Sequence, residues 1–167
     1  MKLGDGVEQA IHSVLLLCGL SPTGLLSAAA IADFHGVSTS YLLKHLQPLA
    51  AAGILHSVPG PKGGYRLGRA PDDISLLDIV LAVEGPEPAF RCAEIRQRGP
   101  APLEARFFKT PCAINVAMLK AEQAYRAELA KVSAADLLNG LDPDTGDAIA
   151  ARACAFFKDH ERNRHKE

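Results

Sequence analysis

Apolar residues recur every three or four positions along most of the chain, which is the spacing of amphipathic α-helices. A first helix is predicted over residues 5–20, with one buried face made of Val7, Ile11, Val14, Leu15 and Cys18. Asp5 is its expected N-cap, because Glu8 follows three residues later as in a capping box. A second helix is predicted over Ser27–Phe34, and Gly36 is well placed to cap its end.

A third helix is predicted to begin after Ser38, a good N-cap residue, and to end at Gly53. The positions that can face the core are Tyr41, Leu42, Leu46, Leu49 and Ala50. The positions left for the outside are Ser38, Thr39, Ser40, Lys44, His45 and Gln47. Pro48 predicts a bend, because proline cannot donate the helical hydrogen bond to the carbonyl of Lys44. Two helices joined by a short glycine-containing turn form the helix-turn-helix pattern.

Two short runs with β character follow, Ile54–Val58 and Tyr65–Leu67, and the Gly/Pro-rich residues 59–64 form a turn between them. A helix-turn-helix followed by a β-hairpin is a winged helix-turn-helix. The predicted fold class is therefore mainly α with a small β-wing.

The second half of the chain is predicted to be helical around an irregular loop. The expected helices are Leu76–Val83, a longest helix Cys112–Val132 that starts at Pro111, and Ala134–Asn139. Residues 85–110 are rich in Gly, Pro and charge and are predicted to form the loop. The longest helix carries a broad apolar stripe, typical of a C-terminal dimerisation helix, at Ile114, Ala117, Met118, Ala121, Ala124, Tyr125 and Leu129.

Length and composition fit one domain with an appendage. We expect a winged helix-turn-helix DNA-binding domain over residues 1–71, a sensor loop and dimerisation helix over 72–142, and a helical tail over 143–167 whose last residues, 161–167, fray. The chain shows neither a long uncharged apolar run nor a basic leader with a cleavage site, so a cytoplasmic protein without a membrane partner is expected.

Charge is segregated along the chain, although the net charge is only −1. No Asp or Glu occurs between His35 and Pro71, and this span carries Lys44, Lys62, Arg66 and Arg69. A surface helix beside a basic hairpin is what a groove of duplex DNA would meet, so DNA binding is predicted. The alternative is a winged helix used for contacts with another protein.

The predicted DNA-binding residues fall into three groups. The third predicted helix, which begins after Ser38, is the expected DNA-reading helix. The side chains at its start that can reach base edges and phosphates are Ser38, Thr39, Ser40 and Tyr41. The cations that can neutralise phosphates are Lys44, Lys62 and Arg66. Gly63 and Gly64 can let the tip of the wing approach the DNA backbone closely.

The cysteines are widely spaced and form no CxxC pair, which argues against a zinc ribbon or a thioredoxin-like site. Cys18 is expected in the core, and Cys154 has no evident role. Cys112 lies at the N-terminus of a predicted helix, where a thiolate is favoured, so it is either a redox thiol or a packed residue. Arg96 and Arg98 are expected to be solvated or paired with local acids.

The order of motifs resembles the Rrf-two type of bacterial transcription regulators, whose members include IscR, NsrR and RsrR. The resemblance covers residues 1–142 and is carried by GPKGGYRL, DIVLAVEGPEP, FRCAEIRQRGP and PCAINVAM. It implies a homodimeric winged-helix regulator, here expected to be a repressor, that binds a pseudo-palindromic operator. In many members of that family an iron–sulfur cluster controls operator binding.

The usual cluster site of that family uses three closely spaced cysteines and cannot be built here, because only Cys92 and Cys112 lie in that region. The segments MKLGDGVEQAIH, ADFHGVS and FRCAEIRQRGP resemble those of RsrR, an atypical redox-responsive member. That resemblance implies a [2Fe–2S] cluster that crosses the dimer, with Glu8 and His12 from one subunit and His35 and Cys92 from its partner. Imidazole ligands can couple the reduction potential to protonation.

Other interpretations of these residues remain. The same donor set suits zinc, and Glu8 alone could be a first-turn carboxylate that favours the helix dipole. A metal-free regulator could respond to thiol oxidation or to a small ligand. A metal-dependent enzyme using His12, His35 and Cys92 is disfavoured, because no further acid–base constellation accompanies them. No enzymatic activity is therefore predicted.

Overall fold

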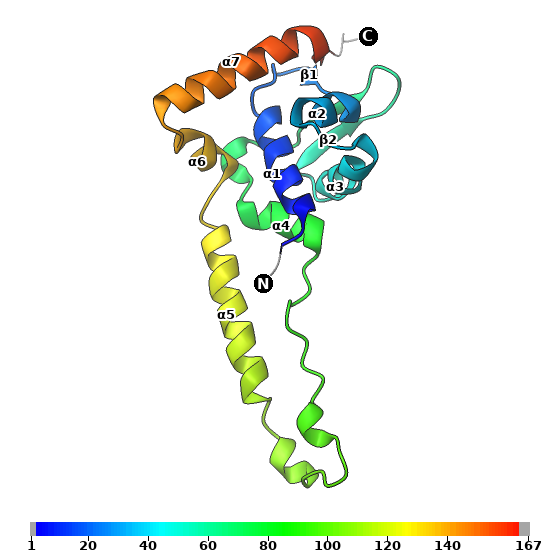
Figure 1. Ribbon diagram of the computed structural model, residues 1–167, viewed down its shortest axis with the longest axis vertical. Coiled ribbons are helices and arrows are strands. Elements are labelled where there is room, and N and C mark those ends of the chain that lie inside the picture. Colours follow the sequence, from blue (N-terminus) through cyan, green and yellow to red (C-terminus); the bar gives the residue numbers. More distant parts are fainter. Residues whose placement is uncertain (1–2, 164–167) are drawn as a thin grey trace.

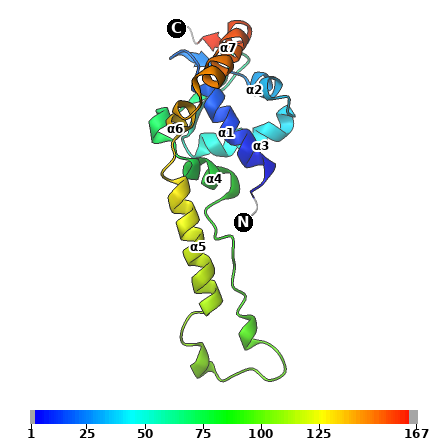
Figure 2. The ribbon, with the colours of Figure 1, turned by 60° about the vertical axis from the view of Figure 1, so that its left-hand side comes forward.

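A helical head with a long arm makes up the molecule (Figure 1). The structure is a computed structural model that describes residues 3–163. The head contains α1 (Asp5–Leu17), β1 (Gly24–Leu25), α2 (Ala28–His35), α3 (Thr39–Ala51), β2 (Leu55–Val58), β3 (Gly64–Leu67), α4 (Leu76–Glu84), α6 (Ala134–Asn139), α7 (Pro143–His160) and β4 (Arg162–Asn163). The arm contains α5 (Ala113–Leu129) and the largely extended segment 85–112 that runs beside it (Figures 1 and 2).

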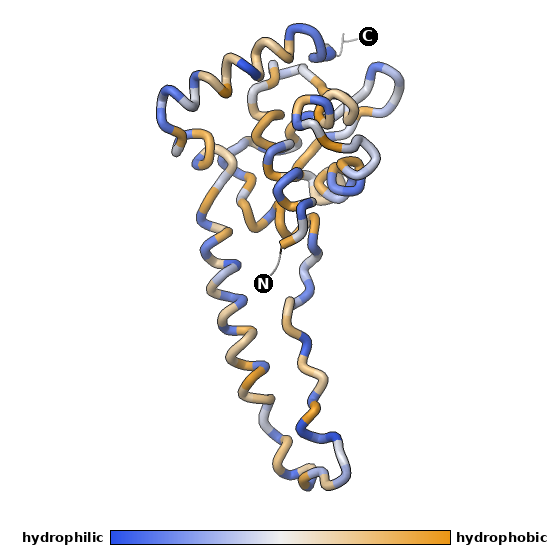
Figure 3. The backbone as a smooth tube through the Cα atoms, viewed as in Figure 1, coloured by the Kyte–Doolittle hydropathy of each residue, from blue (hydrophilic) through white to orange (hydrophobic). Residues whose placement is uncertain are grey.

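The core lies where α1 packs against α3, α4 and α6. Its fully buried side chains include Val14, Leu26, Ile31, Leu42, Leu46, Leu49 and Ile79. The hydrophobic positions gather where the helices of the head meet, whereas the arm mixes hydrophobic and hydrophilic positions (Figure 3). Every residue of α5 remains at least partly exposed to solvent.

The first helix starts differently from the prediction. Its N-cap is Gly4, and Asp5 is already the first helical residue, so the predicted Asp5 cap is wrong. The backbone N–H of Gly4 donates instead to the carboxylate of Glu84 at 3.0 Å. Because this acceptor belongs to α4, no local sequence pattern could predict the hydrogen bond. The helix also ends at Leu17 rather than at residue 20.

The helix-turn-helix is confirmed. Ser27 caps α2 by accepting a hydrogen bond from the N–H of Ala30 at 3.1 Å, and Gly36 ends the helix with φ 66°. Helix α3 runs without interruption through Pro48. Two of its side chains depart from their predicted positions. Tyr41 is 39% exposed rather than in the core, whereas the ring of His45 turns inward and covers Gly6 of α1.

The wing is an antiparallel hairpin of β2 and β3, in which Leu55 pairs with Leu67. A bridge between Leu26 and Tyr65 ties the wing to the segment before α2, with N–H to O distances of 3.1 and 2.7 Å. Next to Leu26, β1 pairs with β4 from the end of the chain. The predicted fold class, mainly α with a small β-wing, is therefore confirmed.

The second half contains the predicted helices with shifted ends. Capping boxes of Ser75 with Asp78 and of Ser133 with Asp136 start α4 and α6. The loop before α5 contains two short 3-10 turns, Ile95–Gln97 and Ala105–Phe108, and a third turn, Pro71–Asp73, precedes α4.

The helix predicted to be the longest is α5, which has 17 residues, whereas α7 has 18. Cys112 is the N-cap of α5, so Pro111 lies before the helix rather than at its start.

The tail is more ordered than predicted. Phe157 is buried, and the expected fraying from Glu161 onward is wrong for Arg162–Asn163, because these residues form β4. The remaining residues, 164–167, lie outside the described part of the chain. No helix within residues 3–163 is long and apolar enough to cross a membrane.

We expect Leu46→Ala to lower the free energy of unfolding by about 2–5 kcal/mol, because it leaves a cavity in a fully buried part of the core. Chemical denaturation of the two proteins measures the change. Gln47→Ala, an exposed neighbour on the same helix, is the control and should stay within about 0.5 kcal/mol. Equal stability of Leu46→Ala and the parent chain would contradict this packing.

Candidate nucleic-acid interface and metal ligands

The start of α3 presents polar side chains to solvent. The exposed hydroxyls of Ser38 and Ser40 hydrogen-bond to each other at 3.0 Å, next to Thr39. The amine of Lys44 lies 5.8 Å from the centroid of the exposed Tyr41 ring. A helix N-terminus without nearby acids favours an anion such as phosphate. These residues form one continuous surface that could meet DNA.

The wing carries the other predicted contacts. Lys62 is exposed in the turn, and Arg66 in β3 pairs with His56 across the hairpin. A side chain on Gly63 would collide with the carbonyl of Val58, and one on Gly64 with the backbone of Leu26. The packing of the hairpin therefore requires glycine at both positions, whether or not the wing approaches DNA.

Arg69, the last cation of the acid-free span, is engaged within the protein. Its guanidinium donates to the carbonyl of Asp73 at 3.1 Å and lies 3.8 Å from the carboxylate of Asp78. The cations of this span that remain at the candidate surface are Lys44, Lys62 and Arg66.

The structure brings His12 and His35 together within one protomer, with ring centroids 5.9 Å apart. Burial, then the charges of His12 and Arg152, lower the pKa of His35, while a hydrogen bond to the backbone of His12 acts in the opposite direction. The buried Nε2 atom of His35 has no hydrogen-bond partner among the described residues. A neutral imidazole with a free nitrogen is a suitable metal ligand.

Glu8 lies one turn before His12 on the exposed side of α1, and both residues line the same shallow depression. His12 also borders a mostly apolar cleft of about 420 Å³ that includes His35 and is walled by α6 and α7. His12 thus lies between the predicted carboxylate ligand and the second imidazole.

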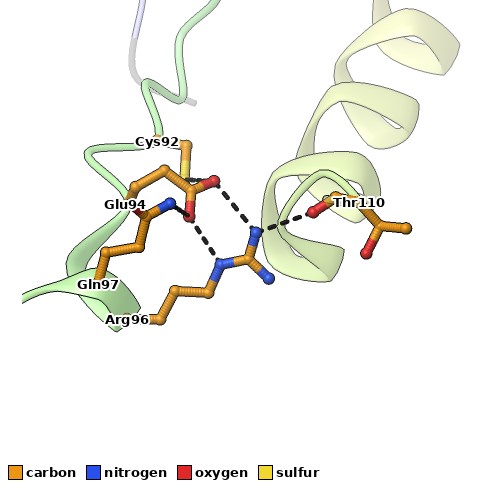
Figure 4. Close-up of polar contacts among 5 residues, drawn as sticks. All are labelled: Cys92, Glu94, Arg96, Gln97 and Thr110. Carbon is orange, nitrogen blue, oxygen red and sulfur yellow. Dashed lines mark hydrogen bonds and ion pairs between the residues drawn. The ribbon is translucent and has the colours of Figure 1, made fainter. Parts of the chain in front are cut away.

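Cys92 lies on the arm, in a cluster of polar contacts with Glu94 and Arg96 (Figure 4), and it forms no metal-binding group with Glu8, His12 or His35 within the described residues. Its thiol is 3.8 Å from the carboxylate of Glu94, which forms an ion pair with Arg96 at 2.7 Å. Arg96 also donates to the carbonyl of Thr110 at 2.9 Å and so joins the two sides of the arm. The expectation that Arg96 pairs with a local acid is confirmed.

Within residues 3–163 of one protomer, no three His, Cys, Asp or Glu side chains lie together as a metal site. The predicted ligands divide between the head, with Glu8, His12 and His35, and the arm, with Cys92. A site containing all four residues therefore needs a second protomer.

The other cysteines occupy three different environments. Cys18 packs against the core, and its burial raises the thiol pKa to about 11. Cys154 is exposed. Backbone N–H groups of Asn115 and Ile114 lower the pKa of Cys112, and the thiol of Cys92 lowers it further. Cys92, from the predicted loop, and Cys112, at the start of α5, therefore lie near each other across the arm.

The residues of α7 that hold the end of α2 were not predicted from the sequence. Arg152 donates to the carbonyl of Phe34 at 2.7 Å, and its guanidinium lies 4.3 Å from the centroid of the Phe34 ring. Phe156 packs edge-on against the same ring. These contacts join positions more than a hundred residues apart, so periodicity could indicate an amphipathic helix but not its partner.

Comparisons with known proteins agree with this geometry. The family model Rrf2, described as an iron-dependent transcriptional regulator, matches residues 3–140. YffB of Lactococcus lactis subsp. lactis is 34% identical over 137 residues, which is 82% of this chain and 86% of that protein. The HTH-type transcriptional regulator IscR of Aliivibrio salmonicida is 36% identical over 92 residues, 55% of each chain.

Solved structures show the same fold. CymR, the global cysteine regulator of B. subtilis, superposes with a TM-score of 0.64 at 25% identity and covers 85% of this chain and 99% of its own. IscR of T. potens gives 0.61 at 23% identity, covering 85% and 89%. The chain therefore belongs to the Rrf2 family of transcription regulators and is a DNA-binding winged-helix protein rather than an enzyme.

Proposed function

We propose that this Rrf2-family protein is a cytoplasmic, homodimeric repressor that binds a pseudo-palindromic operator and senses redox or iron–sulfur status. The observation that carries the proposal is the position of His35. The buried Nε2 atom of this histidine has no hydrogen-bond partner within residues 3–163, and the histidine lies only three residues before Ser38, where the DNA-reading helix α3 begins. In this proposal residues 1–71 bind DNA, 72–142 sense and dimerise, and 143–167 form an appended tail.

The arm supports the homodimer. Ile114 and Met118, one turn apart on the same face of α5, are 64% and 45% exposed. An apolar helix face of this kind is stabilised when a second copy covers it. In a two-fold dimer the two reading helices can enter successive major grooves, which would explain a pseudo-palindromic operator.

The chemistry of the donor set fits a [2Fe–2S] cluster. One carboxylate, two imidazoles and one thiolate provide four ligands, and imidazole can replace thiolate on one iron. The family resemblance divides these ligands as Glu8 and His12 from one subunit and His35 and Cys92 from its partner. Because the rings of His12 and His35 lie 5.9 Å apart within one protomer, we propose instead that one head supplies Glu8, His12 and His35 and that the arm of the second protomer supplies Cys92. When bound, such a cluster supplies one-electron redox chemistry. Zinc remains the alternative metal for the same residues.

Two connections link the proposed cluster site to α3, the DNA-reading helix. The first is the short turn at Gly36 and Val37, which joins His35 to the start of α3. In the second, the ring of His45, in the middle of α3, lies directly on Gly6, two residues before the predicted ligand Glu8 on α1. A shift of α1 or of His35 would therefore move the reading helix, and a coupling of about 1–3 kcal/mol is typical of such switches.

One observation favours a second candidate function, a metal-free regulator that responds to thiol oxidation. Cys92 and Cys112 lie near each other across the arm, and the Cys112 pKa is lowered. Oxidation of this pair would join the two sides of the arm. A colourless protein whose operator affinity changes with thiol oxidation would support this candidate over the first.

We expect Lys62→Ala to weaken binding to a duplex selected in vitro by the parent protein. Each lost phosphate contact should reduce the slope of log affinity against log salt by about 0.9. Fluorescence anisotropy over a range of salt concentrations measures both quantities. Lys131→Ala, which removes an exposed cation between α5 and α6, is the control and should leave both unchanged. An unchanged slope in Lys62→Ala would mean that the wing does not contact DNA.

We expect anaerobically purified protein to be coloured and to contain iron and sulfide. We expect Glu8→Ala and Cys92→Ala to lose the colour, the iron and the sulfide, because each variant removes one of four ligands. Visible spectra with iron and sulfide analysis provide the measurement. Cys154→Ala, which removes an exposed thiol on α7, should retain the iron. Iron-free, colourless parent protein would refute the cluster, and equal operator affinity of oxidised, reduced and cluster-free protein would refute the coupling.

A further inference from the structure

The last residues that the structure describes, 161–163, lie against β1 and the wing. The family match ends at residue 140, so α7 and β4 lie beyond it. In β4, Arg162 pairs with Leu25, and the neighbouring residue Leu26 is bridged to Tyr65 of the wing. Backbone pairing therefore continues from β4 through β1 to Tyr65 of β3.

The side chain of Arg162 makes a second, direct connection to the wing. Its Nη1 atom donates to the carbonyl of Pro61 at 3.1 Å and to the carbonyl of Gly63 at 2.9 Å. These carbonyls flank Lys62, the residue of the turn whose amine is predicted to contact phosphate. Hydrogen bonds from a guanidinium are stronger than those between neutral groups, so Arg162 holds the backbone on both sides of Lys62.

Arg162 is itself held by its neighbours. The carboxylate of Glu161 accepts hydrogen bonds from the backbone N–H of Ser21, at 3.0 Å, and from the Ser21 hydroxyl. It lies directly over Gly24, where a side chain would not fit. Further back, Phe157 is buried in the core. The donor to the wing is thus attached to the head rather than to a free tail.

We propose that the C-terminal segment 161–163 is a strap that holds the wing in its DNA-binding position, and that Arg162 is the positioning residue. A two-stranded hairpin is marginally stable by itself, and each strand of this wing has only four residues. Bonds from outside the hairpin therefore decide how well the turn is ordered. The inference rests on the proposed contact of the wing with DNA.

The alternative role for Arg162 is a direct phosphate contact. The two roles differ in a double-mutant cycle with Lys62. A positioning residue acts through Lys62, so its effect on affinity should largely disappear in Lys62→Ala. A direct contact should have the same effect in both backgrounds and should add its own reduction of the salt slope.

The test uses the full-length protein with Arg162→Ala, Arg162→Lys and Lys158→Ala. Hydrogen exchange of the free protein reports on the wing amides, including the Gly63 N–H that bonds to the Gly60 carbonyl. We expect faster exchange there in Arg162→Ala, and affinity for the selected duplex weaker by about 10-fold or more, the size of losing a hydrogen bond to a charged group. Arg162→Lys should restore both, because a single nitrogen makes both bonds.

Lys158→Ala removes an exposed cation from the same extension and should change neither measurement. Unchanged wing exchange in Arg162→Ala would overturn the strap, and so would an equal loss of affinity in the Lys62→Ala background. Failure of the parent protein to bind any duplex would refute the proposed function instead. The exchange comparison does not require DNA and would still decide whether Arg162 orders the wing.

Discussion

Helix α1 is the element on which the organisation of the head depends. Its buried side packs against α3, α4 and α6 (Figure 2), while Glu8 and His12 lie on its exposed side. The fit is close at Gly6, where only the absence of a side chain lets the ring of His45 lie against the helix. Because interiors are close-packed, α1 cannot shift without moving the reading helix, and this constraint underlies the proposed sensing.

The two functional surfaces meet at the end of α2. His35 ends this helix, and the surface predicted to contact DNA begins at Ser38. Contacts of Arg152 with Phe34 hold the same place from the side of α7. The head therefore contains both imidazoles and the predicted DNA-reading elements, whereas Cys92, the proposed thiol ligand, lies on the arm. Dimerisation is consequently part of the proposed sensing and not only a means of doubling the DNA contacts.

Much of the fold could be predicted because its signals are local. Ser27 and Gly36 mark the two ends of α2, and the Gly/Pro turn marks the wing, since capping and turn chemistry act over a few residues. The candidate site could be predicted less well. The four ligands came from a resemblance to a family, and only the contact of His12 with His35 is present within one protomer. The position of Cys92 relative to them depends on how two chains pack.

The sequence by itself determined the order of helices and strands, the acid-free basic span and the family. Only the tertiary structure decided which side chains of that span face outward. Tyr41 is exposed and His45 turns inward because α1 offers His45 a glycine to pack against. It also decided that Glu84 caps α1 and that Arg162 reaches the wing. Both contacts join residues 80 or more positions apart, and such partners are chosen by packing rather than by local preference.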